Sequence, residues 1–332
     1  MLTKTLRITT SPHLKKGMDT PTIMRHVVYA LLPVAIFSVF VFGSCAFWVL
    51  ATTVLSCLIT EFLINQIAGN HNSLTDSSAI ITGLLLGLTL PPIFPLWMAA
   101  VGGFIAIALG KMAFGGLGNN VFNPALVARA VLQAAFPVAI TTWYPAMQAD
   151  RFQSLPSSLF TTPFFQPVFD GVSGATPLSA FKFDQVVASA NDLAFGFVSG
   201  SLGETSAFLI LVGGIYLWYR GIINWRVPVG IIATVFLLSG ALYLIDATTF
   251  APPQFMVLSG GLMLGAVFMA TDMVGSPMTN KGMWIYAVFI GLMVVVIRSW
   301  GGLPEGVMYA ILLANAISPH IDRMVKDRVY GT

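Results

Sequence analysis

Long apolar runs, separated by short polar or glycine- and proline-rich stretches, dominate the hydrophobic pattern of this 332-residue chain. A helix needs roughly 17–25 mostly apolar residues to cross a bilayer, and ten stretches approach or reach that length. They are 25–43, 45–65, 78–91, 95–112, 123–140, 206–220, 227–245, 254–271, 283–299 and 305–320. The pattern predicts an all-α integral membrane protein with about ten transmembrane helices.

Several of these predicted helices are short or interrupted. Pro91, Pro92 and Pro95 interrupt the third and fourth, and glycine pairs punctuate the chain at 260–261 and 301–302. Non-helical backbone at membrane depth is tolerated only where protein or a cavity satisfies its polar groups. We therefore expect the interrupted helices to be covered by other helices or to line a cavity.

The composition excludes a soluble globular domain. Hydrophobic residues make up 56% of the chain and charged residues 9%, with a mean hydropathy of +0.84, whereas soluble domains carry about 25% charged residues. The net charge of +3 is small and gives no reason to expect a nucleic-acid partner. The apolar composition predicts that membrane lipid surrounds the chain. The N-terminus lacks the short apolar core and small-residue cleavage site of a removed signal peptide.

Basic residues near the ends of the predicted helices set the orientation. Residues 1–25 carry five basic side chains against Asp19 alone, which predicts a cytoplasmic N-terminus; the segment 141–205 then lies outside and has a net charge of −3. Arg298 is the one basic residue that falls on the wrong side. The predicted divisions are a cytoplasmic N-terminal segment 1–24, a first helical repeat 25–140, an extracytoplasmic loop 141–205, a second repeat 206–320 and a cytoplasmic tail 321–332.

The two helical regions resemble each other in sequence. Residues 114–130 align without gaps on 300–316 with seven identities in seventeen positions, and 83–87 match 261–265. An odd number of predicted helices separates the copies, so one copy runs upside down relative to the other. The sequence predicts two inverted five-helix repeats, an arrangement typical of transporters.

Ionisable residues inside the predicted helices are candidate functional residues, because they are costly there. For Glu61 a structural ion pair and a place in an ion path are equally good interpretations. Lys111, at the end of the fourth helix, is expected to extend to the membrane interface. Arg129 is predicted to pair with Glu61 or Asp76, or to contact a cofactor.

Asn119, Asn120 and Asn123 precede Pro124, which opens a predicted helix. Their amides suit either hydrogen bonding to a ring system or ordinary helix capping. Asp272 and Lys281 are expected to flank a solvated turn. The two cysteines, Cys45 and Cys57, form no Cys-x-x-Cys cluster and are expected in the core, and the four histidines offer no facing pair for haem. Any electron carrier is therefore predicted to be organic.

The polar loop contains Asp170-Gly-Val-Ser-Gly-Ala-Thr176, whose glycines and following proline predict an irregular segment presenting a hydroxyl. This motif resembles the site at which a flavin transferase joins FMN to threonine in the RnfD/NqrB family. Further segments are similar to that family: 118–127, 203–206, 270–273, 279–283, 304–307 and 312–317. The compact N-terminus and the terminal Arg328-Val-Tyr-Gly resemble RnfD more than NqrB.

The resemblance implies FMN attached through its phosphate to Thr176, with Asp170, Ser173, Gly174 and Ala175 forming the motif. It also implies a second flavin held without a covalent bond, such as riboflavin, for which Asn119, Asn120, Asn123 and Arg129 are the candidate residues. The implied protein is a multi-pass subunit of a bacterial inner-membrane ferredoxin:NAD oxidoreductase that moves Na+ or H+. Its implied partners are the A, B, C, E and G type Rnf subunits and a flavin transferase.

Two other interpretations of the residues stay open at this point. The repeats and interrupted helices also fit a secondary transporter or channel for a small solute, in which 141–205 carries no cofactor. A scaffold for redox partners, without a cofactor of its own, is the third interpretation. Only the flavoprotein interpretation predicts a chain that retains a yellow colour after purification.

Overall fold

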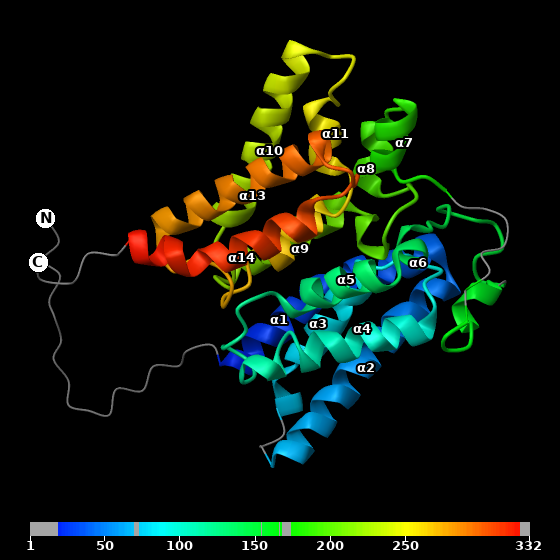
Figure 1. Cartoon of the computed structure of the whole chain (residues 1–332), viewed down its shortest axis with the longest axis vertical. Helices are drawn as coiled ribbons and strands as arrows, with labels where there is room; N and C mark the ends of the chain where they lie inside the picture. Colours follow the sequence, from blue (N-terminus) through cyan, green and yellow to red (C-terminus); the bar gives the residue numbers. More distant parts are fainter. Residues whose placement is uncertain (1–18, 70–72, 154, 166, 168–173, 326–332) are drawn as a thin grey trace, which may run out of the picture.

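The computed structural model describes residues 19–69, 73–153, 155–165, 167 and 174–325, and this part of the chain is all-helical (Figure 1). The elements up to residue 141 are α1 (Thr20–Phe42), α2 (Ser44–Ala68), η1 (Ser73–Asp76), α3 (Ser78–Leu88), α4 (Leu96–Ala108), η2 (Met112–Phe114), α5 (Pro124–Ala135) and α6 (Pro137–Thr141). Those that follow are η3 (Ser157–Phe160), α7 (Pro177–Asp184), α8 (Ala190–Phe195), η4 (Leu202–Glu204), α9 (Ala207–Tyr219), α10 (Arg226–Ile245), α11 (Pro253–Leu258), α12 (Leu262–Leu264), the π-helical turn η5 (Gly265–Met269), α13 (Asn280–Trp300) and α14 (Val307–Met324). Helical structure therefore lies within each of the ten predicted stretches.

Five stretches of the described residues are long and apolar enough to cross a membrane: Thr20–Phe42, Ser44–Ala68, Leu96–Phe114, Arg226–Ile245 and Asn280–Trp300. Three shorter apolar helices, Ser78–Leu88, Pro124–Ala135 and Ala207–Tyr219, accompany them. Many large apolar side chains on the long helices face outward; Leu244, for example, is 87% exposed and Ile67 85%. An outer surface this apolar is suited to lipid, and the chain is a multi-pass membrane protein.

The helices group into α1–α6 and α9–α14, coloured blue to green and yellow to red in Figure 1. Within the first group α2 packs along α4, and within the second α10 packs along α13. Between the groups, α1 lies against α9 and α5 against α14. Glycines permit these close approaches, since a Cβ on Gly103 would lie 2.7 Å from Ser56 and one on Gly230 2.7 Å from Ala287. Small residues at helix contacts are typical of packing in membranes.

The structure confirms the predicted interruptions. The third helix ends at Leu88, and α4 begins only at Leu96 after the prolines. The stretch 254–271 is divided into α11, α12 and η5, with Gly260 at φ +66° in the break. The predicted helix 123–140 is also divided, because Pro137 begins α6 immediately after α5 ends.

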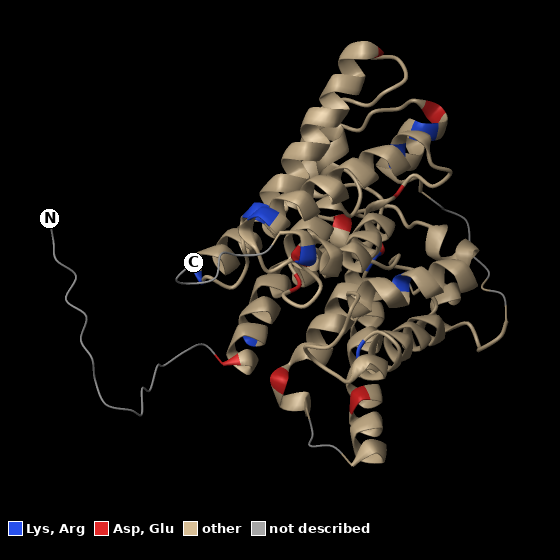
Figure 2. Ribbon diagram, turned by 60° about the vertical axis from the view of Figure 1, so that its left-hand side comes forward, with Lys and Arg blue, Asp and Glu red and all other residues tan. Residues whose placement is uncertain are grey.

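Arg298 breaks the orientation pattern because it does not lie at the surface. It is buried, and its guanidinium donates to the carbonyl oxygens of Met256 (2.5 Å) and Ser259 (3.0 Å), where α11 ends. A cation is favourable at the C-terminal end of a helix, where unpaired carbonyl groups point. Charged residues are sparse over the whole ribbon, and several lie in its interior (Figure 2).

Candidate cofactor site

Thr176 is the N-cap residue of α7. Its backbone is extended (φ −69°, ψ 153°), its Oγ1 accepts a hydrogen bond from the backbone N–H of Ser179 (3.2 Å), and Pro177 occupies the first helical position. Threonine before proline is restricted to extended backbone, and proline is favoured at that first position. The sequence Thr176-Pro177 therefore ends the loop and starts a helix that the loop prediction did not include.

The residues before Thr176 are hydrogen-bonded to the segment that follows α6. The N–H of Gly174 donates to the carbonyl oxygen of Trp143 (2.9 Å), which forms an isolated antiparallel bridge. A Cβ at position 174 would lie only 2.7 Å from Ser199 Oγ, so a larger residue does not fit. Gly174 and Ala175 line the site with Thr176, whereas Asp170 and Ser173 lie outside the described residues.

Thr176 borders a cavity of about 550 Å³. The walls come from the loop before α4, from α5 and α6 with the residues after them, from the segment around η3, from α7 with the residues before it, and from the loop before α14. They include Arg129, Trp143, Tyr144, Ser158, Thr176 and Glu305. Small-molecule sites typically occupy about 300–1,000 Å³ and combine apolar walls with a few placed polar groups. This cavity is large and mixed enough for an aromatic ring system.

Arg129 is one of the residues that line this cavity. Its Nη2 forms an ion pair with Glu305 Oε2 (2.9 Å), and its Nη1 donates to the carbonyl oxygen of Thr89 at the end of α3. The predicted pairing of Arg129 with Glu61 or Asp76 is therefore wrong. The partner lies 176 positions away in the second helical group, and no local spacing indicates it.

Glu204 approaches the same ion pair from η4. Ser201 Oγ donates to Glu204 Oε1 (2.8 Å), and the Glu305 carboxyl lies close enough to Glu204 to interact with it electrostatically. Burial and the negative charge of Glu305 raise the pKa of Glu204 well above its usual range, against the opposing effects of Arg129 and Ser201. Neither glutamate was predicted from the sequence as a site residue, although both fall within the segments that carry the family resemblance.

A second, smaller cavity of about 130 Å³ lies at the opposite end of α5. Asn120 and Asn123 line it, together with Asp272 and Lys111, whereas Asn119 is exposed and donates to Gly115. Asn123 caps α5 by accepting from the N–H groups of Ala125 and Leu126, so the capping interpretation is confirmed for this residue. Arg129 does not line this cavity; it borders the cavity of Thr176 instead.

Two further expectations about this region were wrong. Asp272 is not part of a solvated turn, because it is half-buried and accepts a hydrogen bond from the Asn120 amide (3.4 Å). Lys111 does not extend to the membrane interface, because it is buried and its Nζ lies 2.8 Å from both carboxylate oxygens of Glu61. The ion-pair interpretation of Glu61 is confirmed.

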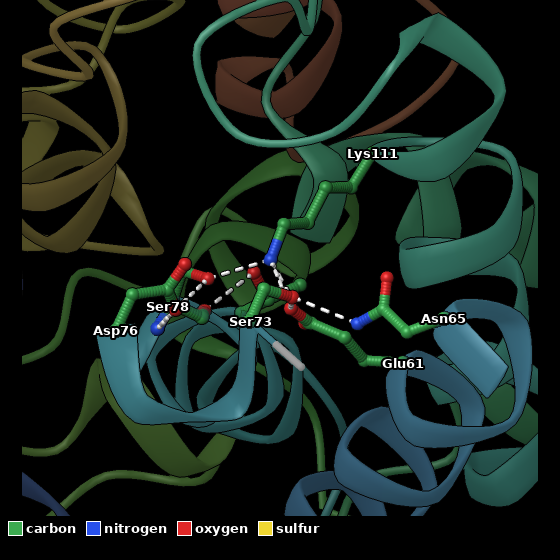
Figure 3. Close-up of polar contacts among 7 residues, drawn as sticks. Glu61, Asn65, Ser73, Asp76, Ser78 and Lys111 are labelled. Carbon is green, nitrogen blue, oxygen red and sulfur yellow. Dashed lines mark hydrogen bonds and ion pairs between the residues drawn. The ribbon is translucent and has the colours of Figure 1, made fainter. Parts of the chain in front are cut away.

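Serines surround that ion pair (Figure 3). Lys111 Nζ also donates to Ser78 Oγ (2.6 Å), Ser73 donates to Glu61, and Asn65 donates to Ser73 (2.9 Å). Asp76 accepts from the Ser78 hydroxyl (2.6 Å), which fixes the start of α3. Glu61 and Lys111 could each be singled out in the sequence, but nothing in the sequence indicated that they are in contact, since 50 positions separate them.

Cys45 and Cys57 are free and buried, which confirms that both belong to the core. Among the described residues no group of three His, Cys, Asp or Glu side chains is placed to hold a metal ion. The polar groups of the site are thus hydroxyls, amides and paired charges.

The fold and its cavities define a multi-pass, all-helical membrane protein with cavities of mixed polar and apolar lining at both ends of α5. The sequence model of the NQR2, RnfD, RnfE family matches residues 7–331, so the chain belongs to that family. It is an RnfD-type subunit, of the class found in ion-translocating oxidoreductase complexes.

Three relatives illustrate the similarity. The D subunit of the proton-translocating ferredoxin:NAD(+) oxidoreductase complex of Clostridium ljungdahlii is 41% identical, covering 98% of this chain and 96% of the relative. Its Na(+)-translocating counterpart from Acetobacterium woodii is 40% identical, covering 98% and 95%. The D subunit of the ion-translocating oxidoreductase complex of Halorhodospira halophila is 38% identical, covering 96% and 94%.

Proposed function

We propose that this chain is the D subunit of an ion-translocating ferredoxin:NAD+ oxidoreductase in a bacterial plasma membrane, and that it relays electrons through FMN attached to Thr176. The observation that carries the proposal is the position of Thr176: its side chain caps a helix at the wall of a 550 Å³ cavity. The names of the relatives support the complex and its substrates.

The residues around Thr176 suit a phosphate ester. The N-terminus of α7 directs backbone N–H groups toward position 176, and such helix ends favour phosphate. Arg129 adds a positive charge within the same cavity. When bound, FMN would supply one- and two-electron transfer, while the chain's own residues hold the ring and set its electrostatic surroundings.

For a second flavin, the cavity at the start of α5 is the best candidate, with Asn120 and Asn123 as hydrogen-bonding residues. Its 130 Å³ is below the roughly 300 Å³ typical of ligand sites, so neighbouring side chains have to move for a ring to enter. Asn119 and Arg129 are not included, because neither lines this cavity.

We further propose that the two helical groups are inverted five-helix repeats that couple electron flow to movement of Na+ or H+. The equivalent pairings of α2 with α4 and α10 with α13 support the repeats, as do the interrupted helices in each group. Glu61 is a candidate for the ion path, since a buried carboxylate with hydroxyl neighbours offers oxygen ligands.

The proposed orientation places the N- and C-termini in the cytoplasm and 141–205 in the periplasm. The basic residues near the cytoplasmic helix ends support it. A periplasmic loop is accessible to a flavin transferase acting outside the membrane. The other subunits of the complex would deliver and remove the electrons.

The test is in-gel flavin fluorescence of the denatured full-length chain, coexpressed with a matching flavin transferase. The expected result is a fluorescent wild-type band that is lost in Thr176→Ala. Thr142→Ala is the matched control, because Thr142 lines the same cavity and its hydroxyl donates to the carbonyl oxygen of Val138 (2.7 Å); its band should remain.

A dark wild-type band beside an active transferase would contradict the flavin assignment. A fluorescent band that persists in Thr176→Ala would place the attachment elsewhere. With a dark wild type, the solute-transporter interpretation becomes the better account, and uptake assays with the purified chain would follow.

A further inference from the structure

Another cavity lies beside the C-terminal ends of α10 and α13, next to α7. Its volume is about 260 Å³. Its walls include Phe181, Lys182, Leu242, Phe250, Met256 and Arg298. It is distinct from the Thr176 cavity, since Pro304 is the only described residue that lines both. The described residues that line it include two cations and no carboxylate, so the cavity is suited to an anion.

Arg298 contributes a hydrogen-bond donor that has no partner. The residue is only 6% exposed, and its two terminal nitrogens donate to the carbonyl oxygens of Met256 and Ser259. Its Nε is buried and has no hydrogen-bond partner among the described residues. A buried donor without an acceptor is costly, and the planar guanidinium matches the oxygen atoms of a phosphate. An anion in the cavity that Arg298 lines would supply the missing acceptor.

Lys182 is the second cation of this cavity. Its Nζ donates to the carbonyl oxygens of Gly301 (2.5 Å) and Leu303 (3.2 Å), which carry no net charge. An ammonium group has three N–H donors, so one N–H is left for a ligand. Lys182 therefore offers an anion both a charge and a hydrogen bond.

The positive charges of Lys182 and Arg298 are not neutralised by ion pairs. Neither residue takes part in an ion pair within the described part of the chain. Glu204 and Glu305 are close enough to interact electrostatically with Arg298, but Glu305 is already paired with Arg129. Charged groups in a membrane protein are costly to bury unless they are paired. The two cations thus indicate an anion that comes from outside the chain.

The helices α10 and α13 run parallel, and both end at this cavity. A Cβ on Gly230 would lie 2.7 Å from Ala287, and one on Gly291 would lie 2.6 Å from Thr234, so residue numbers rise together along the two helices. Both helices are long and apolar enough to cross a membrane. Their C-terminal ends therefore reach the same membrane surface, and the cavity lies at that level.

The side chains around these helix ends are typical of the membrane interface. Trp300, the last residue of α13, is exposed and makes a T-shaped contact with Phe250, with ring centroids 5.9 Å apart. Leu244 and Ile245, at the end of α10, are exposed apolar residues. Tryptophan is enriched where lipid headgroups meet the hydrocarbon. The two cations therefore lie at the depth of the headgroups.

We propose that this cavity binds the phosphate group of an anionic phospholipid, with Lys182 and Arg298 as its hydrogen-bond donors. The volume of 260 Å³ is below the roughly 300–1,000 Å³ of sites that enclose a whole small molecule, which suits a headgroup whose acyl chains lie in the bilayer. Free phosphate would meet the same two cations, but it makes no use of the apolar walls formed by Phe181, Leu242 and Phe250. The site needs no flavin, so it is independent of the proposed function.

The test is native mass spectrometry of the delipidated full-length chain, titrated in detergent with phosphatidylglycerol. The wild type should bind one lipid more tightly than any other, and Lys182→Gln should weaken this binding by roughly tenfold or more, because a hydrogen bond between charged groups is lost. Lys182→Arg keeps the charge and should retain the lipid. Lys281→Gln is the matched control, because Lys281 is an exposed lysine at the opposite end of α13; it should bind as the wild type does.

Two competing ligands distinguish the possible sources of the phosphate. Diacylglycerol with the same acyl chains lacks the phosphate and should bind weakly; equal binding of the two lipids would overturn phosphate recognition. Inorganic phosphate at millimolar concentration should displace little of the lipid, and complete displacement would overturn the lipid assignment in favour of free phosphate.

The arginine is tested in the same assay. Arg298→Gln should weaken phosphatidylglycerol binding as Lys182→Gln does. If Arg298→Gln fails to fold, Lys182→Gln and Lys182→Arg decide the question. Equal lipid binding by the wild type and Lys182→Gln would contradict the proposed site.

Discussion

At the scale of single residues, the polar groups in the interior are paired in ways that depend on distant parts of the chain. Lys111 and Glu61 join α2 to the end of α4, and Arg129 and Glu305 join α5 to the loop before α14. Each of the four is costly to bury alone, and each pair removes part of that cost. The candidates Glu61 and Arg129 were evident from the sequence because charge is rare there, but their partners were not.

Lys111→Met should lower stability by about 3–5 kcal/mol, because it leaves the buried Glu61 carboxylate without its cation. Thermal unfolding in detergent measures the change. Lys281→Met, at an exposed lysine near the start of α13, is the control and should shift stability by no more than about 0.5 kcal/mol. The double variant Glu61→Gln/Lys111→Met should recover much of the loss; a double variant as unstable as Lys111→Met would contradict the explanation.

The turn after α10 should weaken in acid. Hydrogen bonds from Thr248 and Thr249 lower the pKa of Asp246 from its ordinary value of 3.8 to about 2. A lowered pKa means that the ionised carboxylate stabilises the turn above pH 3.8 and that this contribution is lost as the pH falls toward 2. The protection factor of the Thr248 amide, which corrects the exchange rate for the pH dependence of intrinsic exchange, should fall over that window, and in Asp246→Asn the protection factor should lose this acid dependence.

At the scale of elements, the hydrophobic pattern predicted the helices well because their length and apolar character are set locally. The short helices within 141–205 were not predicted, since α7 and α8 are brief and lack a long apolar run. The N-cap role of Thr176 could have been predicted from the sequence, because threonine followed by proline is a common helix start. The cavity beside it could not have been predicted, because its walls come from five separate parts of the chain.

Gly260→Ala should destabilise the break between α11 and α12 by about 1–3 kcal/mol. Gly260 has φ +66°, and a Cβ there would lie 2.7 Å from Leu178 and 2.9 Å from the guanidinium of Arg298. Gly261→Ala is the matched control, since that residue has φ −74° and its Cβ would meet nothing within 4 Å. Equal melting temperatures for the two variants would contradict this account of the break.

At the scale of the whole molecule, residues from both helical groups enclose the Thr176 cavity. Arg129 comes from the first group and Glu305 from the second, and they meet in an ion pair. Lys182 on α7 adds a further connection, because its ammonium donates to the carbonyl oxygens of Gly301 (2.5 Å) and Leu303 (3.2 Å). The site therefore depends on correct packing of the two groups.

The proposed orientation predicts opposite accessibility for two exposed positions. Phe164 is 94% exposed within 141–205, and Met278 is 85% exposed in the loop before α13. In spheroplasts, Phe164→Cys should react with a membrane-impermeant maleimide, whereas Met278→Cys should react only after permeabilisation. Because Cys45 and Cys57 are buried, the wild type is the unlabelled control; the reverse labelling pattern would refute the orientation.

The burial of Thr176 bears on when the flavin attachment proposed above could take place. Thr176 is only 1% exposed, and Lys182 on α7 is hydrogen-bonded to the segment that precedes α14. An enzyme that esterifies this hydroxyl needs far more access than the packed chain offers. Flavinylation would then belong to biogenesis, completed while the helices are still assembling, and a chain that folds before meeting its transferase would be a poor substrate.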